Sequence, residues 1–234
     1  MSKVLCVSPA YNEEKTVSKV VEGALKYTDG IIVVDDGSTD STYKEAMKAG
    51  ATVIKHNKNQ GKGVALKTGF KKALETTADI IIVLDADGQH NPKEIPKLLK
   101  TMNYEDSDIV VGSRFLGDIK GMPRIRILSN TLTTMILRLY FGLPITDSQS
   151  GFRAYKRGVL EKVEFSAPRF SAETEILIDA NRKDFKISET GVQTLYGEEK
   201  SKMRNFEDTI RWIWDVDKQL INSIRRKLSM GRNK

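Results

Sequence analysis

Short apolar runs rich in valine and isoleucine alternate with helical patterns along the first half of this chain. The runs predict buried strands at Val4–Ser8, Ile31–Asp35, Val53–Lys55, Ile80–Leu84 and Ile109–Gly112. Amphipathic helices are expected between them, at about 13–25, 41–49, 63–75 and 91–102, and Asn12 is expected to cap the first. Strand, helix and strand in this order require right-handed crossovers. The sequence therefore predicts an α/β fold with a Rossmann-like, mostly parallel sheet flanked by helices.

The second half of the chain is less regular. We expect an apolar helix at Leu128–Phe141, a strand near 152–155, a helix at 173–182 and a strand at 186–196. A long amphipathic helix with Trp212 and Trp214 is expected at 206–228, and no acid follows Asp217. We therefore divide the chain into a main domain, 1–205, and a basic amphipathic C-terminal helix and tail, 206–234.

Charge and cysteine content limit the class of protein. The 234 residues carry 38 Lys and Arg against 31 Asp and Glu, a formal charge of +7, which favours an anionic partner: a nucleotide, a phospholipid surface or a nucleic acid. The single cysteine, Cys6, excludes an intramolecular disulfide and a cysteine zinc cluster and is expected to be a buried thiol. We see neither a signal peptide nor an apolar window of the ~18 residues that a membrane span needs, so we expect an intracellular protein.

Ligands of parallel sheets bind at the carboxyl ends of the strands. The loops there are Pro9–Glu13, Asp35–Asp40, Asp85–His90 and Gly112–Phe115. Asp85 and Asp87, two residues apart in a turn, can converge on one hard cation, Mg²⁺ or Mn²⁺, with a further oxygen from Gln89. The alternative is a solvated acidic turn before the next helix.

Two common nucleotide-binding classes are excluded. A Rossmann dinucleotide site needs glycines after the first strand, and the turn at 9–13 has none. The run Gly61-Lys62-Gly63 lacks a third glycine at the required place and is interpreted as a turn before a helix, with Lys62 able to face phosphate. No Walker A pattern exists, so dehydrogenase and P-loop functions are disfavoured.

Five ordered motifs carry a family resemblance. They are Pro-Ala-Tyr-Asn-Glu at 9–13, Val-Val-Asp-Asp-Gly-Ser-Thr-Asp at 33–40, Asp-Ala-Asp-Gly-Gln-His at 85–90, Gly-Ser-Arg-Phe at 112–115 and Asp-Ser-Gln-Ser-Gly-Phe-Arg-Ala at 147–154. Over about residues 1–200 the chain resembles the family 2 glycosyltransferases, and within them the dolichyl-phosphate mannose and glucose synthases. The resemblance implies a GT-A fold, an inverting mechanism, a nucleotide-sugar donor and a divalent metal.

The resemblance also implies roles for individual residues. Asp87 and Arg114 would be catalytic, and Asp85, Asp87 and Gln89 would surround the metal. The nucleotide sugar would meet Pro9, Tyr11, Glu13, Asp36, Asp85, Lys202 and Arg204. The acceptor phosphate would meet Arg114, Arg124, Arg126 and Ser129.

The expected reaction is hexose transfer from a nucleotide sugar to a polyprenyl (dolichyl) phosphate. A UDP-sugar is favoured over GDP-mannose because Asp-Gly-Gln-His at 87–90 departs from the Asp-Leu-Gln-His common in mannose synthases. A phosphate monoester is largely a dianion at neutral pH, so this acceptor needs no strong base. We expect peripheral contact with the cytoplasmic face of a membrane, through the C-terminal helix and the apolar helix at 128–141. The oligomeric state stays open.

Other functions remain as alternatives. Transfer to a hydroxyl of a glycan or protein would need a base near Glu173 or Glu175, which we interpret as helix-surface or supporting acids. A nucleic-acid-binding module is disfavoured because the motif loops are acidic and the basic residues gather at the C-terminus. A processive polymerase is disfavoured because Arg211-Trp212 lacks the preceding glutamine of Gln-x-x-Arg-Trp.

Overall fold

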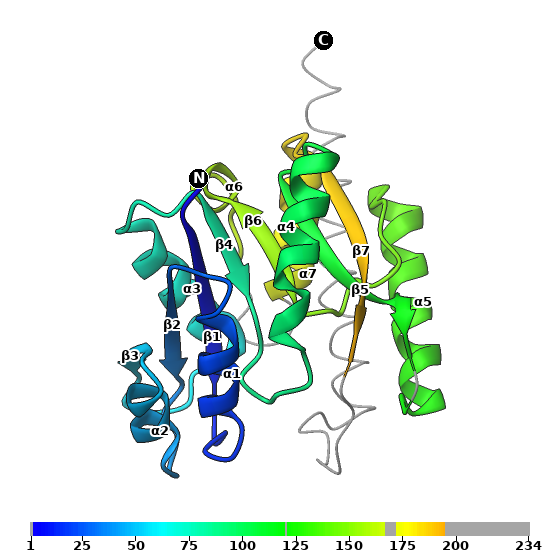
Figure 1. The fold of residues 1–234 in the computed structure, drawn as a ribbon. Coiled ribbons are helices and arrows are strands. Elements are labelled where there is room, and N and C mark those ends of the chain that lie inside the picture. Colours follow the sequence, from blue (N-terminus) through cyan, green and yellow to red (C-terminus); the bar gives the residue numbers. More distant parts are fainter. Residues whose placement is uncertain (1, 120, 167–171, 195–234) are drawn as a thin grey trace.

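The computed structural model describes residues 2–119, 121–166 and 172–194, which contain one seven-stranded sheet (Figure 1). Its order is β3-β2-β1-β4-β6-β5-β7. The strands are β1 (Val4–Ala10), β2 (Gly30–Asp35), β3 (Thr52–Lys55), β4 (Ile80–Val83), β5 (Ile109–Asp118), β6 (Arg153–Lys156) and β7 (Ile187–Gln193). Only β6 runs antiparallel to its neighbours, so the predicted mostly parallel sheet is confirmed.

Helices cover both faces of the sheet (Figure 1). One face packs on α1 (Val17–Ala24), α2 (Thr42–Lys48) and α4 (Ile95–Tyr104), which follows the short 3₁₀ turn η1 (Pro92–Glu94). The other packs on α3 (Lys62–Leu74), α6 (Arg157–Leu160) and α7 (Ala172–Arg182). Cys6 is fully buried in the first of these layers, as predicted. Because β1, β2 and β4 are buried on both sides, nearly every residue in them is apolar.

The start of α1 differs from the prediction. The helix begins at Val17, and Asn12 lies upstream in the left-handed region with φ 54°. Asn12 Oδ1 accepts a hydrogen bond from the Thr39 backbone N–H (2.9 Å), and the Asn12 N–H donates to Ser38 Oγ (2.9 Å). Asn12 therefore joins the loops after β1 and β2 instead of capping α1.

The region after β5 also differs from the prediction. β5 continues beyond the expected end at Gly112 to Asp118, with an irregular register against β7 between Ser113 and Asp118. The helix expected at Leu128 begins earlier: α5 spans Arg124–Phe141 and stands beyond β7 at one end of the molecule (Figure 1). In the described part of the chain, no helix has the length and apolar character that crossing a bilayer requires.

Candidate active site

The loops after β1 and β2 hold one another at the carboxyl edge of the sheet. The Glu13 backbone N–H donates to Thr42 Oγ1 (2.7 Å), and the Glu14 N–H donates to Asp40 Oδ2 (3.2 Å). Pro9 is buried at the end of β1, and Tyr11 is 38% exposed beyond it. The two predicted nucleotide motifs therefore form one continuous surface.

Asp36 organises the turn that leads into α3. His56 Nδ1 lies 2.7 Å from Asp36 Oδ1, and the backbone N–H groups of Gln60 (3.0 Å) and Gly61 (2.8 Å) donate to the same carboxylate. The side chain is buried, so these bonds offset the cost of burying its charge. Contact of Asp36 with a base or ribose stays a prediction, whereas the structure assigns it a role in shaping the loop before Lys62.

A half-buried lysine joins two carboxylates in the middle of the edge. Lys62 Nζ lies 2.7 Å from Asp85 Oδ1 and 2.7 Å from Glu173 Oε1. Burial alone would lower the pKa of Lys62, but the two carboxylates hold it above its ordinary value. The sequence left Glu173 as either a helix-surface acid or a supporting acid. The surface position is wrong, because the first turn of α7 faces the site and Glu173 is buried there.

Asp87 lies beside this cluster, and its carboxyl group has a raised pKa. Burial, followed by the charge of Asp85, raises the pKa of Asp87 to about 6. Such a pair of carboxylates suits a divalent cation, which would neutralise both charges. Within residues 2–119, 121–166 and 172–194, no three His, Cys, Asp or Glu side chains form a self-contained metal site. A cation here would therefore complete its shell with donor phosphate oxygens and water.

Two further contacts shape this acidic loop. The Gln89 backbone N–H donates to Asp87 Oδ1 (2.9 Å), while the predicted side-chain contact of Gln89 with metal stays a prediction. His90 Nε2 lies 3.8 Å from Asp85 Oδ2, and burial lowers the pKa of His90 to about 4, so its ring is neutral at pH 7.

The loop before β6 approaches the acidic cluster closely. A Cβ at Gly151 would lie 2.5 Å from Asp85 Oδ2 and 3.0 Å from Lys62 Nζ, so any larger residue here would displace the Asp85 carboxylate. Because β6 is antiparallel, its amino end lies at the same edge as the carboxyl ends of the parallel strands. This loop is how the second half of the chain reaches the site.

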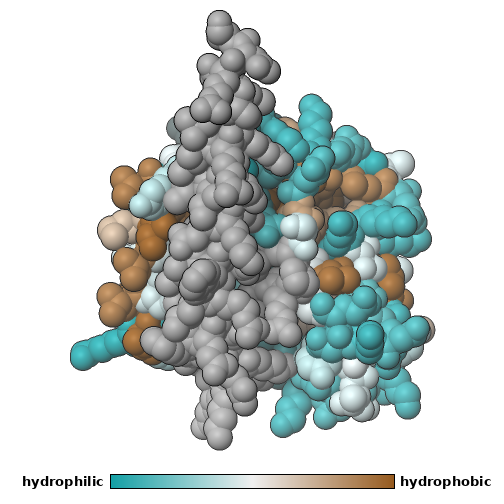
Figure 2. Space-filling view, turned by 180° about the vertical axis from the view of Figure 1, so that it is seen from behind, coloured by the Kyte–Doolittle hydropathy of each residue, from teal (hydrophilic) through white to brown (hydrophobic). Residues whose placement is uncertain are grey.

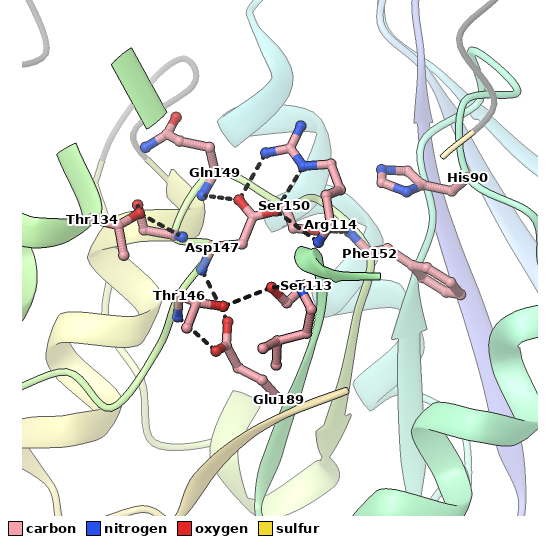
Figure 3. A network of polar contacts seen from close by, with 12 residues as sticks. His90, Ser113, Arg114, Thr134, Thr146, Asp147, Gln149, Ser150, Phe152 and Glu189 are labelled. Atoms are coloured by element: carbon pink, nitrogen blue, oxygen red, sulfur yellow. Dashed lines mark hydrogen bonds and ion pairs between the residues drawn. The ribbon is translucent and has the colours of Figure 1, made fainter. Parts of the chain in front are cut away.

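Arg114 is held by a carboxylate that the sequence prediction did not include (Figure 3). Its Nε donates to Asp147 Oδ2 (2.7 Å) and its Nη2 to Asp147 Oδ1 (2.8 Å), a bidentate pair. Burial alone would raise the pKa of Asp147, but the bonds from Arg114 keep it below its usual range. Arg114 is therefore oriented rigidly at the end of the site.

The three predicted acceptor residues of α5 do not share one face. Arg124 is exposed, whereas Arg126 and Ser129 are half-buried. At helical spacing Arg126 lies on the face of Asn130 and Thr133, which are buried against the domain. Arg124 and Arg126 occupy the first turn of the helix rather than a segment before it. The predicted donor residues Lys202 and Arg204, and the C-terminal helix at 206–228, lie outside the described residues.

Comparison with known proteins identifies the family. The model of glycosyl transferase family 2 matches residues 6–164. The chain is 37% identical over 217 residues to the UDP-N-acetylglucosamine–dolichyl-phosphate N-acetylglucosaminyltransferase of Methanococcus voltae, covering 83% of this chain and 86% of that protein. It is 33% identical over 231 residues to the dolichol-phosphate mannosyltransferase of Pyrococcus furiosus, covering 92% of this chain and 64% of the relative.

Solved structures show the same fold. The glucosyl-3-phosphoglycerate synthase of Mycobacterium tuberculosis, crystallised with Mn²⁺, UDP-glucose and phosphoglyceric acid, matches with a TM-score of 0.69 and 25% identity. The match covers 90% of this chain and 76% of that one. The predicted GT-A fold is confirmed, and Mn²⁺ and UDP-glucose in this neighbour are consistent with a divalent cofactor and a nucleotide-sugar donor.

Proposed function

Because the chain belongs to glycosyl transferase family 2, we propose that it transfers a hexose, with inversion, from a nucleotide sugar to the phosphate of a polyprenyl phosphate. The observation that supports a polyprenyl phosphate as the acceptor is the character of α5. This helix contains three arginines and no acid, joins the site on one face and exposes an apolar stripe on the other. Both dolichyl-phosphate transferases named above support the same acceptor.

The donor occupies the acidic edge in this proposal. The surface formed by Pro9, Tyr11 and Glu13 takes the base, and a UDP-sugar is favoured over GDP-mannose. The Methanococcus voltae relative is named for a UDP-sugar, and the mycobacterial neighbour was crystallised with UDP-glucose. The Pyrococcus furiosus relative is named for mannosyl transfer, so the donor is left to experiment.

The reaction would be a single in-line displacement at the anomeric carbon. Mg²⁺ or Mn²⁺, when bound by Asp85 and Asp87, would supply positive charge that stabilises the departing diphosphate. Lys62 holds Asp85 in place through its two ion pairs and partly balances the negative charge of the cluster. Glu173 Oε2 is buried without a hydrogen-bond partner among the described residues, and it can accept a hydrogen bond from a hydroxyl of the sugar.

The acceptor phosphate would meet Arg114 and the first turn of α5. Cations in that turn oppose the helix dipole, so a bound anion between Arg126 and the backbone N–H groups would relieve the repulsion. Arg114, fixed by Asp147, orients the attacking oxygen, and a phosphate dianion needs no base to deprotonate it.

The lipid tail of this acceptor would lie in a membrane beside α5. Five apolar side chains of its outer face are between 48% and 77% exposed: Ile125, Leu128, Leu132, Met135 and Leu139. Figure 2 shows a group of apolar residues along the left edge of the view, the side on which α5 lies. An amphipathic helix of this kind lies in the plane of the headgroup region, and its arginines favour anionic lipid. We place the enzyme on the cytoplasmic face of a membrane.

The test of this function is an acceptor comparison. Purified protein with Mn²⁺ is given UDP-glucose, UDP-N-acetylglucosamine or GDP-mannose together with dolichyl phosphate, dolichol or a short alkyl phosphate, and the products are analysed. Product is expected with the phosphates and not with dolichol. Equal transfer to dolichol would overturn the phosphate-nucleophile mechanism.

A second candidate is transfer to a hydroxyl of a soluble acceptor. The observation that favours it is the phosphoglyceric acid bound in the mycobacterial neighbour. Adding 3-phosphoglycerate to the same assay separates the two functions, because a water-soluble product formed without lipid would identify the second.

A further inference from the structure

Glu189 lies on β7, beneath the site, and takes no part in the reaction as described so far. β7 pairs in parallel with β5, with Glu189 opposite Val111 and Gly191 opposite Ser113. The Glu189 carboxylate accepts two backbone hydrogen bonds, from Thr146 N–H (2.6 Å, Oε2) and Asp147 N–H (3.0 Å, Oε1). One side chain of β7 thus fixes two successive peptide groups of the loop before β6 (Figure 3).

The same loop is held from two other elements. Ser113 Oγ on β5 lies 2.7 Å from Thr146 Oγ1. On α5, Thr134 Oγ1 lies 2.9 Å from Ser148 Oγ. The loop therefore joins β5, β7 and α5, and Glu189 supplies its charge-assisted bonds, which are the stronger kind.

The loop passes its orientation on to Arg114. Asp147, whose N–H is held by Glu189, receives the Arg114 guanidinium at 2.7 and 2.8 Å and the Arg114 backbone N–H at 3.1 Å. A bidentate pair fixes both the position and the plane of the guanidinium. A shift of the Asp147 backbone would therefore also move the Arg114 guanidinium.

We propose that Glu189 is a positioning residue for glycosyl transfer, which acts through the Thr146 and Asp147 backbone to aim Arg114 at the phosphate it binds. This inference rests on the proposed function, because that function places a phosphate at Arg114. Glu189 touches no substrate. Burial raises the pKa of Glu189, as expected for a carboxyl held close to the Asp147 carboxylate in a half-buried site.

The test is a double-mutant cycle on acceptor kcat/KM with the full chain, comparing wild type, Glu189→Gln, Arg114→Ala and the double variant. Glutamine retains one acceptor oxygen but presents an N–H group to the other backbone donor, so the loop shifts. In the wild-type background, we expect Glu189→Gln to lower kcat/KM roughly tenfold, since a small misplacement of a substrate-binding group costs this much or more. In the Arg114→Ala background the same change should have less than a twofold effect.

A merely structural role for Glu189 predicts a different result. The loss from Glu189→Gln would then be the same factor in both backgrounds, and this outcome overturns the proposal. Asp108→Asn is the matched control, because Asp108 Oδ2 accepts the Lys186 backbone N–H (2.9 Å) at the other end of the same two strands. It should show no coupling to Arg114→Ala.

A spectroscopic measurement keeps the inference testable if a variant loses all activity. The ¹H–¹⁵N signal of Arg114 Nε–H can be assigned from its disappearance in Arg114→Lys. In the wild type, the Nε–H proton should exchange slowly with solvent. We expect faster exchange in Glu189→Gln and Glu189→Asp but not in Asp108→Asn, and unchanged exchange in both Glu189 variants overturns the proposal. The acceptor used in the cycle is whichever one the wild type accepts, so failure of the lipid-phosphate assay is read separately from failure of the cycle.

Discussion

The two sides of the site are built in different ways. The proposed donor side, residues 9–14, 35–40, 56–62 and 85–90, consists of the loops after the parallel strands β1, β2, β3 and β4. The acceptor side, residues 113–114, 124–151 and 189, connects β5, α5, β7 and the loop before an antiparallel strand. Its central bonds span 33 residues, from Arg114 to Asp147, and 42 residues, from Asp147 to Glu189.

The two sides also differ in how they carry charge. Acids predominate on the donor side, and Lys62 is the half-buried cation that holds Asp85. On the acceptor side the ionised groups at the centre have dedicated partners: Arg114 pairs with Asp147, and Glu189 with two backbone N–H groups. The comparison suggests that the donor side is completed by its ligand and a cation, whereas the acceptor side is already organised. The predictions below test this difference, from the largest expected effect to the smallest.

The largest effect is expected on the donor side, from Asp87→Asn. Transfer should fall by about a thousandfold or more, since a metal that stabilises the leaving group contributes several kcal/mol. Isothermal titration with Mn²⁺ and UDP should show the lost cation site. Full wild-type activity in excess chelator would contradict the metal role.

The same variant should be more stable than the wild type in metal-free buffer at pH 7. The pKa of Asp87 is raised to about 6 in the folded protein from 3.8, so its ionised form destabilises the fold. Urea unfolding should therefore show that the wild type gains stability relative to Asp87→Asn as pH falls from 7 towards 4. The comparison between the two proteins is needed because the lowered pKa of His90 removes stability from both over the same range. Equal pH profiles would contradict the raised pKa.

Next in size is the effect of Lys62→Met. Removing this cation leaves the half-buried Asp85 and the buried Glu173 without their partner, and the free energy of unfolding should fall by about 3 kcal/mol. Glu173→Gln added to Lys62→Met should restore part of the loss. Lys72→Met, which breaks an exposed pair with Glu75, is the control and should change stability little. Similar losses of unfolding free energy in Lys62→Met and Lys72→Met would mean that the stability of the donor side does not depend on Lys62.

A smaller effect is expected on the acceptor side, from serine at Leu132, Met135 and Leu139 together. In the proposed function these exposed side chains contact the membrane and not the core, so binding to phosphatidylglycerol vesicles should fall by at least about tenfold, because even partial burial of three such side chains exceeds ~1.4 kcal/mol. The melting temperature should stay the same. Leu137→Ser on the buried face of α5 is the matched control and should destabilise the fold instead. Unchanged sedimentation with vesicles would remove α5 as the membrane contact.

The smallest effect is expected at Cys6. Burial raises the pKa of this thiol, so it stays protonated and out of reach of reagents in the native protein. Labelling with a disulfide reagent should follow unfolding, and Lys62→Met should accelerate it. Rapid labelling of the wild type would show that the donor side opens without unfolding.

Several elements could be predicted from the sequence because their signals are local. The five first strands, the helices between them and the acidic loops at their ends follow from apolar runs, periodicity and the rule that parallel strands align their carboxyl ends. Errors arose where a contact between loops outweighed a local preference. Asn12 bonds with Ser38 and Thr39 instead of capping α1, because these bonds join two loops that only the folded sheet brings together.

The sequence by itself determined the α/β fold, the family and the acidic donor loops, since the strand and helix patterns are local and each family motif is a short run of residues. Tertiary structure alone decided the partners: Glu173 beside Lys62, Asp147 on Arg114 and Glu189 beneath the loop. The physical reason is the antiparallel insertion of β6 between β4 and β5, which brings the loop before it to the carboxyl edge of the sheet. The charge of a side chain follows from its residue type. The partner with which it pairs depends on the order of the strands in the sheet, and no local pattern in this chain specifies that order.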